Sequence, residues 1–278
     1  MSTPTAEDVV IPGHAPLAGC LIMPGGTPRA ACVIHAATGT PAGFYRAFAD
    51  WLAGERDVAV LIYDYRDFGR SARGPIRHSR ATMSDWGIND QQTARDWLAA
   101  RLPDIPIWVI GHSLGGMMLP FQMGLAGISR VVTVASGAVH LMDHPWPYRA
   151  FAASFWFGVG AAAHRTLGYV PGRLVGLPGD VAIPGGVFTQ WRRWCTRAGF
   201  HAADPNLPGP DPSALTCPTR MVAVADDALC PPKSVWRLMR AYPQAPKRQL
   251  VLRPTDEPIG HHGVFRRRHA ALWPELVD

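Results

Sequence analysis

The sequence predicts an α/β fold in which a mostly parallel central sheet is covered by helices on both faces. Two observations lead to this prediction. Short apolar segments alternate with segments of helical pattern along most of the 278 residues, and such alternation is typical of parallel sheets flanked by helices. In addition, side chains suited to catalysis follow three of the apolar segments, at the sheet edge where carboxyl ends of parallel strands meet.

The predicted elements follow one another in a regular order. Residues 8–11 and 18–23 flank a Gly/Pro turn and indicate an antiparallel hairpin. After it we expect strands over residues 31–36, 58–64, 107–112, 131–136, 220–225 and 249–252, and helices over residues 42–54, 84–102, 117–126 and 233–242. A last helix is expected around Arg266-Arg267-Arg268, because such a run is typical of a solvated helix face.

The segment Gly111-His112-Ser113-Leu114-Gly115 is a Gly-x-Ser-x-Gly motif that follows the strand at 107–112 directly. In strand–turn–helix context this motif indicates a nucleophile elbow. The turn is so tight that the serine takes a strained conformation, and the glycines are needed because side chains there would collide with the neighbouring strand and helix. Ser113 is therefore the candidate nucleophile, beside the positive end of a helix, whereas His112 is expected only to pack at the turn.

A candidate acid and a candidate base follow Ser113 in the order Ser, Asp, His, which this type of active site requires. Asp226 and Asp227 come directly after the strand at 220–225, and His261 and His262 lie in the loop after the strand at 249–252. Neighbouring residues in an extended loop face opposite ways, so one histidine of the pair is expected to point at Ser113 and the other away.

These motifs resemble the α/β-hydrolase superfamily, and the resemblance covers nearly the whole chain. The segment from Asp64 to Ser71 is similar to its Asp-x-Arg-Gly-x-Gly-x-Ser turn, although Asp67 stands where glycine is usual. Further stretches resemble a bacterial group of uncharacterised α/β-hydrolases: Ala37-Thr38-Gly39, Phe44 to Ala49, Trp191 to Cys195 and Ile259-Gly260-His261. His262 stands where that group tends to have an aromatic residue.

The resemblance implies a catalytic triad of Ser113, Asp227 and His261. His261 follows Gly260 at the position that the group marks as catalytic. Asp227 and Pro231 fit the Asp-x-x-x-Pro spacing of superfamily loops, which favours Asp227 over its neighbour. The acid is expected to lie behind the imidazole, fix its tautomer and stabilise the imidazolium ion.

The resemblance also implies an oxyanion hole made of two backbone N–H groups. One is that of Leu114, immediately after the nucleophile. The other is expected from the loop after the strand at 31–36, where Ala37 is the first choice and Thr38 the alternative. His35, at the end of that strand, is expected to brace the loop by hydrogen bonding rather than to take part in chemistry.

The regular alternation is interrupted between residues 138 and 215. A structureless connection of this length is improbable in a compact domain, so we predict a core at 1–137, a cap at 138–214 and a second core segment at 215–278. Eleven of the chain's twenty-six aromatic residues lie in the cap, and an aromatic roof favours an apolar acyl or aromatic group over a sugar or phosphate. The apolar run 150–163 is too short to span a bilayer and indicates a buried or lid helix.

Composition narrows the remaining possibilities. The five cysteines are odd in number and lack a Cys-x-x-Cys pair, which argues against a disulfide framework or a zinc site. The polar stretch 1–11 is not a signal peptide, so a cytoplasmic location is expected. The net charge of +6 comes mainly from dispersed arginines. Because no nucleic-acid-binding motif accompanies them, we expect no nucleic-acid partner. No metal-ligand spacing and no phosphate-binding glycine loop is found, so we expect no metal and no cofactor.

Together these features predict a cofactor-independent serine hydrolase of the esterase or thioesterase type. It would form an acyl-enzyme with a small or medium apolar ester or thioester. The alternatives are an acyltransferase, peptidase or lyase that uses the same triad, because fold does not fix function, or a binding protein without activity. A serine rather than an aspartate in the elbow argues against a dehalogenase or epoxide hydrolase. The sequence indicates neither the substrate nor the oligomeric state.

Overall fold

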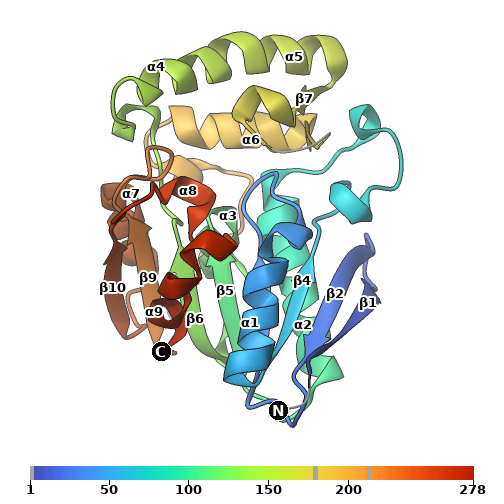
Figure 1. The fold of residues 1–278 in the computed structure, drawn as a ribbon. Helices are drawn as coiled ribbons and strands as arrows, with labels where there is room; N and C mark the ends of the chain where they lie inside the picture. The colour runs from blue at the N-terminus through green and yellow to red at the C-terminus, as the bar shows by residue number, and fades with distance from the viewer. Residues whose placement is uncertain (1–2, 178–180, 212–213) are drawn as a thin grey trace.

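The structure, a computed structural model, describes residues 3–177, 181–211 and 214–278. Its centre is an eight-stranded sheet in the order β1-β2-β4-β3-β5-β6-β9-β10 (Figure 1). The strands are β1 (Thr5–Ile11), β2 (Leu17–Met23), β3 (Ala30–His35), β4 (Val58–Tyr63), β5 (Ile107–His112), β6 (Ile128–Val134), β9 (Thr219–Val224) and β10 (Lys247–Leu252). Strands β1 and β2 form the predicted antiparallel hairpin, and every neighbouring pair from β4 to β10 is parallel. The predicted α/β fold is confirmed.

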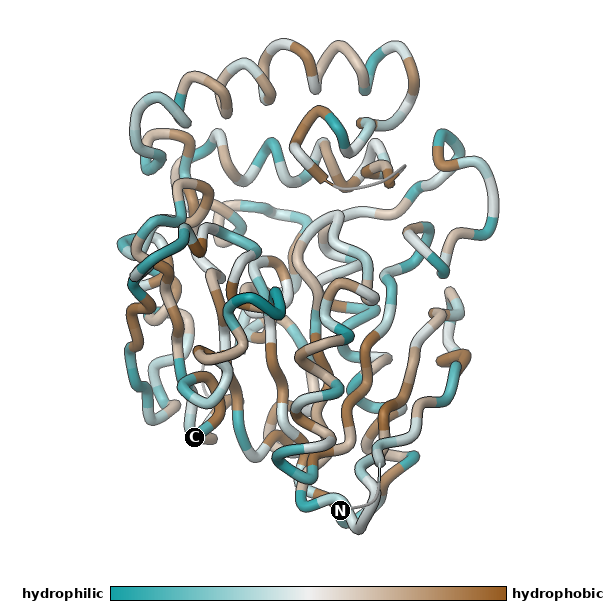
Figure 2. The backbone as a smooth tube through the Cα atoms, in the orientation of Figure 1, coloured by the Kyte–Doolittle hydropathy of each residue, from teal (hydrophilic) through white to brown (hydrophobic). Residues whose placement is uncertain are grey.

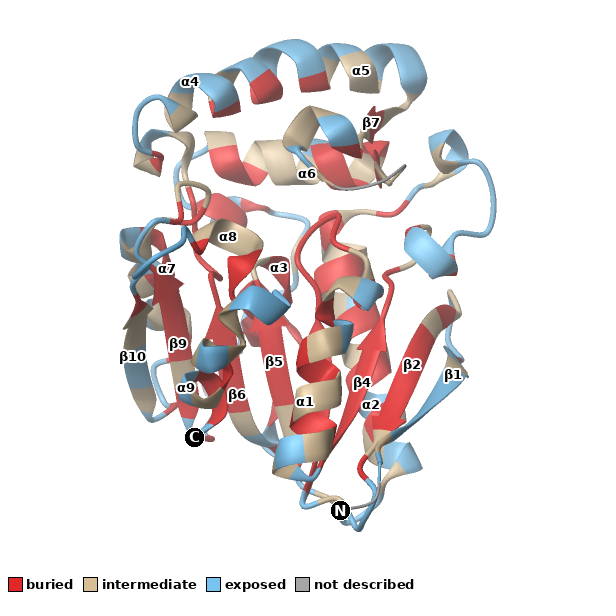
Figure 3. Cartoon of the chain, in the orientation of Figure 1, coloured by how far each residue is buried: buried red, intermediate tan, exposed pale blue. Residues whose placement is uncertain are grey.

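The middle of the sheet is covered on both faces. All residues of β3 and β4 are buried, whereas β1 at the edge is mostly exposed (Figure 3). Helices α1 (Arg46–Arg56) and α9 (Trp273–Val277) lie together on one face, with Phe48 and Trp273 in ring contact at 5.5 Å, and α2 (Gln91–Arg101) lies on the other (Figure 1). Full burial explains why these strands are continuous apolar runs rather than alternating ones.

Two predicted α-helices are wrong, because the structure has short helical turns or 3-10 segments in their place. The helix expected over 117–126 is replaced by the short α3 (Leu114–Met117) and two 3-10 turns, Leu119–Phe121 and Leu125–Gly127. Pro120 lacks the amide hydrogen that a continuing helix needs, and Gly124 takes a φ of 71°. The arginine run at 266–268 is exposed but begins a 3-10 segment, Arg267–Leu272, instead of lying on an α-helix.

Other predicted helices begin or end in tighter or wider turns. A 3-10 turn, Ala42–Tyr45, precedes α1, and a π-helical segment, Asp85–Asp90, precedes α2. Helix α7 (Pro232–Leu238) continues into a 3-10 turn, Met239–Ala241. These departures leave the predicted positions of the elements unchanged.

A cap lies between β6 and β9 in the sequence and above the carboxyl ends of the strands (Figure 1). A single rod is formed by α4 (Tyr148–Ala153), a π-helical segment (Ser154–Val159) and α5 (Gly160–Leu167). Beneath it lie helix α6 (Gly185–Thr196) and a two-stranded sheet of β7 (Tyr169–Pro171) and β8 (Ala182–Pro184). The boundaries at 138 and 214 stay a prediction, and residues 178–180 and 212–213 of this segment lie outside the described residues.

Sheet topology fixes where a site can form. The chain passes from β3 to β4 on one side and then to β5 on the other, and ligands bind parallel sheets at such a switch in direction, outside the carboxyl ends of the strands. The cap covers this edge, while both chain ends lie at the opposite side of the molecule (Figure 1). Among the described helices, none is both long enough and apolar enough to cross a membrane.

Candidate active site

Ser113 lies in a strained turn between β5 and α3. Its φ of 53° and ψ of −114° are values that a residue with a side chain rarely adopts. The turn is held by the Ser113 N–H, which donates to the Val134 carbonyl oxygen at 2.9 Å. A Cβ at Gly111 would lie 2.4 Å from the Gly115 backbone, and one at Gly115 would lie 2.0 Å from the His35 oxygen. The glycines are therefore required by close backbone contacts, as the motif predicts.

The structure brings His261 and Asp227 together beside Ser113. The His261 Nδ1–H donates to Asp227 Oδ2 at 2.7 Å, and the two side chains are 8% and 0% exposed. Asp227 Oδ1 accepts the N–H groups of Leu229 and Cys230 at 2.9 and 2.8 Å. Burial raises the pKa of Asp227, but the His261 charge and these hydrogen bonds outweigh it, so the pKa lies below its ordinary value. Asp227 therefore stays ionised.

Asp226 faces away from the imidazole and holds the loop that carries it. Its two carboxylate oxygens accept the N–H groups of Ile259 and Gly260 at 2.9 and 3.1 Å. Gly260 has a φ of 59°, which suits glycine. The two adjacent aspartates thus contact different parts of one loop, Asp227 the imidazole and Asp226 the backbone just before it.

His262 contacts the loop after β3. Its Nε2 lies 3.1 Å from Thr40 Oγ1, and its ring packs edge-on against Phe44 at 5.8 Å. Burial, together with the charge of His261, lowers the pKa of His262 to about 3. A histidine with so low a pKa is a poor proton acceptor near neutral pH.

The loop after β3 corrects the expected oxyanion donor. The Ala37 N–H already donates to the Tyr45 hydroxyl oxygen at 2.9 Å, and an amide has only one proton to give. By contrast, the N–H groups of Thr38 and Leu114 have no hydrogen-bond partner within the described part of the chain. The Thr38 alternative thus fits this geometry better than Ala37, while Leu114 keeps its predicted place.

His35 does not brace this loop as expected. Its Nδ1 lies 2.7 Å from the hydroxyl of Tyr63, which is a residue of the adjacent strand β4. Tyrosines brace the loop instead: the Tyr65 hydroxyl donates to the Ala36 carbonyl oxygen at 2.8 Å, and Tyr45 accepts from Ala37. Both tyrosines reach the loop from neighbouring segments of the chain, whereas the His35 side chain packs against Tyr63 of β4.

Sequence reasoning missed a hydrogen-bonded chain that crosses the site through His112. The Nε2–H of His112 donates to the carbonyl oxygen of His261 at 2.9 Å, so Nδ1 is unprotonated and accepts from the Tyr45 hydroxyl at 2.7 Å. Burial, then the charges of His261 and His262, holds the pKa of His112 well below its ordinary value. This neutral histidine links the loop after β3 to the backbone of the candidate base.

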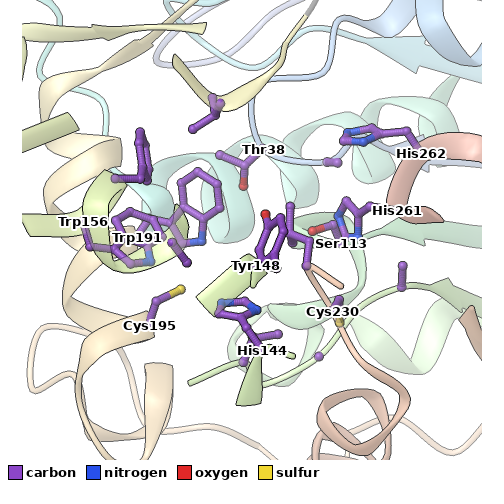
Figure 4. A pocket seen from close by; sticks show the side chains of 18 of the residues that line it. Thr38, Ser113, His144, Tyr148, Trp156, Trp191, Cys195, Cys230, His261 and His262 are labelled. Atoms are coloured by element: carbon purple, nitrogen blue, oxygen red, sulfur yellow. The ribbon is translucent and has the colours of Figure 1, made fainter. Parts of the chain in front are cut away.

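A pocket lies between the cap and these residues (Figure 4). Ser113 and His261 lie side by side at its floor, and Thr38 and Tyr148 face them. Six of the eleven cap aromatics line it: Tyr148, Phe151, Phe155, Trp156, Trp191 and Phe200. The remaining walls are mostly aliphatic, from Met117, Ala135, Val139, Ala152, Val175, Leu177 and Leu229. The sequence could locate these aromatics in the cap but could not say which of them face the cleft.

The sequence matches a known protein family along most of its length. A model described as alpha/beta hydrolase family matches residues 33–274. The chain belongs to this family. Membership supports hydrolase activity.

Solved structures with the same fold include esterases and a thioesterase domain. An esterase from Pyrococcus furiosus is 14% identical and has a TM-score of 0.62, with 98% of this chain and 88% of that chain covered. A thermophilic esterase from Thermogutta terrifontis is 18% identical, with a TM-score of 0.54 and coverages of 97% and 96%. The thioesterase domain from the curacin biosynthetic pathway is 17% identical, with a TM-score of 0.58 and coverages of 99% and 100%. At these identities the likeness concerns the fold alone, and no curated protein sequence matches significantly.

The alpha/beta hydrolase turn after β4 keeps its shape despite Asp67. This residue has a φ of 58°, which explains why glycine is usual there, and aspartate tolerates such values better than most residues. The Ser79 hydroxyl donates to Asp67 Oδ2 at 2.6 Å. At Gly69, which has a φ of 53°, a Cβ would lie 2.4 Å from an Asp64 carboxylate oxygen.

Two cysteine thiols near the site are unreactive, and the described residues form no metal site. Cys195 and Cys230 line the pocket, but burial raises the pKa of both thiols above the ordinary value, so neither is a ready thiolate. Within residues 3–177, 181–211 and 214–278, no group of three or more His, Cys, Asp or Glu side chains could hold a metal ion. That the reaction needs no metal or cofactor stays a prediction.

Gly115→Ala should destabilise the alpha/beta hydrolase core by about 3 kcal/mol or more, because overpacking against backbone atoms cannot be relieved by a rotamer change. The matched control is Gly127→Ala, where an added Cβ meets nothing within 4 Å and the change should stay within about 0.5 kcal/mol. Urea unfolding measures both. Equal stability of the two variants would show that the elbow has room for a side chain.

Tyr45→Phe should cost about 1–3 kcal/mol for each of the two buried groups it leaves unpaired, the Ala37 N–H and His112 Nδ1. Tyr169→Phe is the control, since the Tyr169 hydroxyl has no hydrogen bond among the residues described. Thermal and urea unfolding of both variants give the difference. A Tyr45→Phe protein as stable as the control would contradict the hydrogen-bonded chain.

Proposed function

We propose that the chain is a serine hydrolase that cleaves carboxylic esters or thioesters through an acyl-enzyme on Ser113. The observation that carries this proposal is the 2.7 Å contact between His261 and the ionised Asp227 beside a serine in a strained turn. Nucleophile, base and orienting acid together form the arrangement that activates a serine hydroxyl.

In the proposed acylation step, Ser113 Oγ attacks the carbonyl carbon and its proton passes to His261 Nε2. This nitrogen is free to accept, because Nδ1–H is donated to Asp227. Negative charge develops on the carbonyl oxygen, and the N–H groups of Leu114 and Thr38 are the proposed donors to it. The carbon–oxygen or carbon–sulfur bond then breaks, and the leaving group takes the proton from His261.

Deacylation repeats the same transfers with water. His261 accepts a proton from water as it attacks the acyl carbon, and returns that proton to Ser113 Oγ when the acid leaves. Asp227 stabilises the imidazolium ion in both steps without being protonated itself. The five cysteines, all free in the described chain, support the further proposal of a reducing, cytoplasmic compartment.

The substrate class is proposed from the lining of the pocket. Aromatic and aliphatic side chains form most of its lining, and its few polar side chains include Thr38, His144 and the histidines next to Ser113. Such a cavity binds an acyl chain or aromatic acyl group by removing it from water, and provides few partners for the hydroxyls of a sugar. We therefore propose an apolar acyl group of small or medium length.

Ser113→Ala should stay folded but lose covalent labelling by a fluorophosphonate probe. Its ester hydrolysis should fall by several orders of magnitude, to roughly the 10³–10⁴-fold acceleration that binding and the oxyanion hole provide alone. Ser154→Ala, at an exposed serine of the cap, should label and hydrolyse like wild type. If Ser113→Ala keeps activity within about tenfold of wild type, the assignment of the nucleophile is wrong.

Asp227→Asn should lower kcat by on the order of 10⁴, because an amide in place of the carboxylate favours the wrong histidine tautomer. Asp226→Asn keeps an oxygen that can accept one backbone N–H, so its kcat should change little and its loop should loosen. Steady-state kinetics and unfolding of both variants separate catalysis from stability. A more severe loss in Asp226→Asn would reverse the roles of the pair.

A series of p-nitrophenyl esters from acetate upward tests the apolar pocket. Each added methylene should contribute about 0.8 kcal/mol, so kcat/KM should rise roughly three- to fourfold per carbon until the pocket is filled and then drop. Ala152→Phe, at a buried pocket position, should move the drop to shorter chains without weakening probe labelling. A flat profile would mean that the aromatics only hold the cap to the core.

A further inference from the structure

The outer side of the cap exposes an unusual number of large apolar side chains. Of the eight such side chains that the described residues expose, six lie between residues 142 and 167: Met142, Trp146, Phe151, Phe157, Val159 and Leu167. Single exposed apolar residues are ordinary, but a cluster of this kind marks a surface that contacts a partner or a membrane. We call these six residues and the exposed side of the α4–α5 rod the outer cap face.

The α4–α5 rod has separate apolar residues for its buried side and for its exposed side. Its inward positions are filled, since Phe155 packs on Phe188 at 5.5 Å and Trp156 on Trp191 at 4.9 Å. The opposite side is exposed along Ala150, Phe151, Ser154, Phe157, Gly158 and Ala162 (Figure 3). Residues 150–163 contain no charged side chain, although a helix with one buried side normally turns charged residues to water. Figure 2 shows the same lack of hydrophilic residues along the middle of the rod.

The surroundings of the outer cap face are basic. Residues 144–177 include no aspartate or glutamate. The Arg192 guanidinium lies over the Phe157 ring at 5.2 Å, Arg165 is exposed on the last turn of α5, and Arg77 lies against Gly168 at the end of that helix. None of these three arginines has a carboxylate partner in the part of the chain that is described.

We propose that the outer cap face binds an anionic lipid surface, with the α4–α5 rod lying in the plane of the interface. Aromatic side chains would enter the boundary between headgroups and acyl chains, and the unpaired arginines would meet lipid phosphates. A second copy of the chain fits less well. A two-fold dimer would press this face against itself and place the arginines of both copies in one interface. Residues 144–177 provide no carboxylate to pair with them.

The position of the face is suited to such binding. Phe151 is 47% exposed and also lines the pocket above Ser113, so the rim of the pocket adjoins the outer cap face. Both chain ends lie on the far side of the molecule and leave the face free (Figure 1). Lipid binding goes beyond the proposed hydrolase function and does not depend on it, although an interface would be a source of apolar esters.

The test is co-sedimentation with sucrose-loaded vesicles of phosphatidylcholine, with and without phosphatidylglycerol. Wild type should bind the anionic vesicles at least about tenfold more strongly, and added salt should weaken this binding. The double variant Trp146→Ser, Phe157→Ser should lose about tenfold or more of the partition coefficient on the anionic vesicles. The double variant Arg165→Gln, Arg192→Gln should lose the preference for anionic over neutral vesicles.

Two control variants separate lipid binding by the outer cap face from nonspecific adsorption and from catalysis. Met123→Ser changes a side chain that is 76% exposed and lies outside the cap, and it should bind vesicles like wild type. Ser113→Ala should also bind normally, so a failed nucleophile assignment cannot be confused with failed lipid binding. Thermal unfolding of the Trp146, Phe157 double variant should match that of wild type, which would show that the variant is folded.

Three outcomes would overturn the proposal. Wild type could fail to bind anionic vesicles, or the Met123→Ser control could lose as much binding as the aromatic double variant. Sedimentation velocity could also show a dimer that the aromatic double variant abolishes, which would assign the outer cap face to a second copy of the chain.

Discussion

The turn at Ser113 depends on close backbone contacts at Gly111 and Gly115, where a side chain would not fit. Gly115 packs against the His35 carbonyl, and Gly111 packs against the backbone that follows the serine. This contact fixes the end of β5 against the end of β3 and forces Ser113 into its positive-φ conformation. The strain, on the order of 1–3 kcal/mol, is held by the surrounding sheet. The hydroxyl is thereby presented at the edge where the neighbouring loops bring a carboxylate, an imidazole and N–H groups that have no hydrogen-bond partner among the described residues.

Three histidines lie in contact at this edge, and their surroundings give them different properties. His261 has an ionised carboxylate behind it, whereas His112 and His262 are buried and have no carboxylate partner in the part of the chain that is described. Burial lowers the pKa of His112 and of His262. The two neutral rings therefore act as hydrogen-bonding parts. His112 holds the His261 backbone, and His262 contacts Thr40 on the loop after β3. Of the three imidazoles, the one with a carboxylate partner is therefore the one that lies next to Ser113.

The parts of the molecule that depend on local signals could be predicted from the sequence. Strand positions follow from apolar runs, and strand ends at one sheet edge predict that an aspartate of the pair 226–227 meets a histidine of the pair 261–262. The choice of Asp227 and His261 within these pairs follows from the resemblance to the α/β-hydrolases. The link from Ala37 through Tyr45 to His112 could not, because it depends on how α1 docks on the sheet. The apolar run 150–163 predicts a buried or lid helix, and the structure shows one side of this helix buried and the other exposed. Periodicity alone does not tell which apolar side of a helix finds a partner.

Trapping the acyl-enzyme during turnover tests the central claim most directly. Rapid mixing with a p-nitrophenyl ester, acid quenching and mass spectrometry of the peptides would locate any covalent acyl group. A p-nitrophenol burst matching the enzyme concentration, with the acyl mass on Ser113, is the predicted result. Asp227→Asn should form the same adduct far more slowly. An acyl group on another residue, or steady turnover of wild type by a route that never acylates Ser113, would contradict the proposed mechanism.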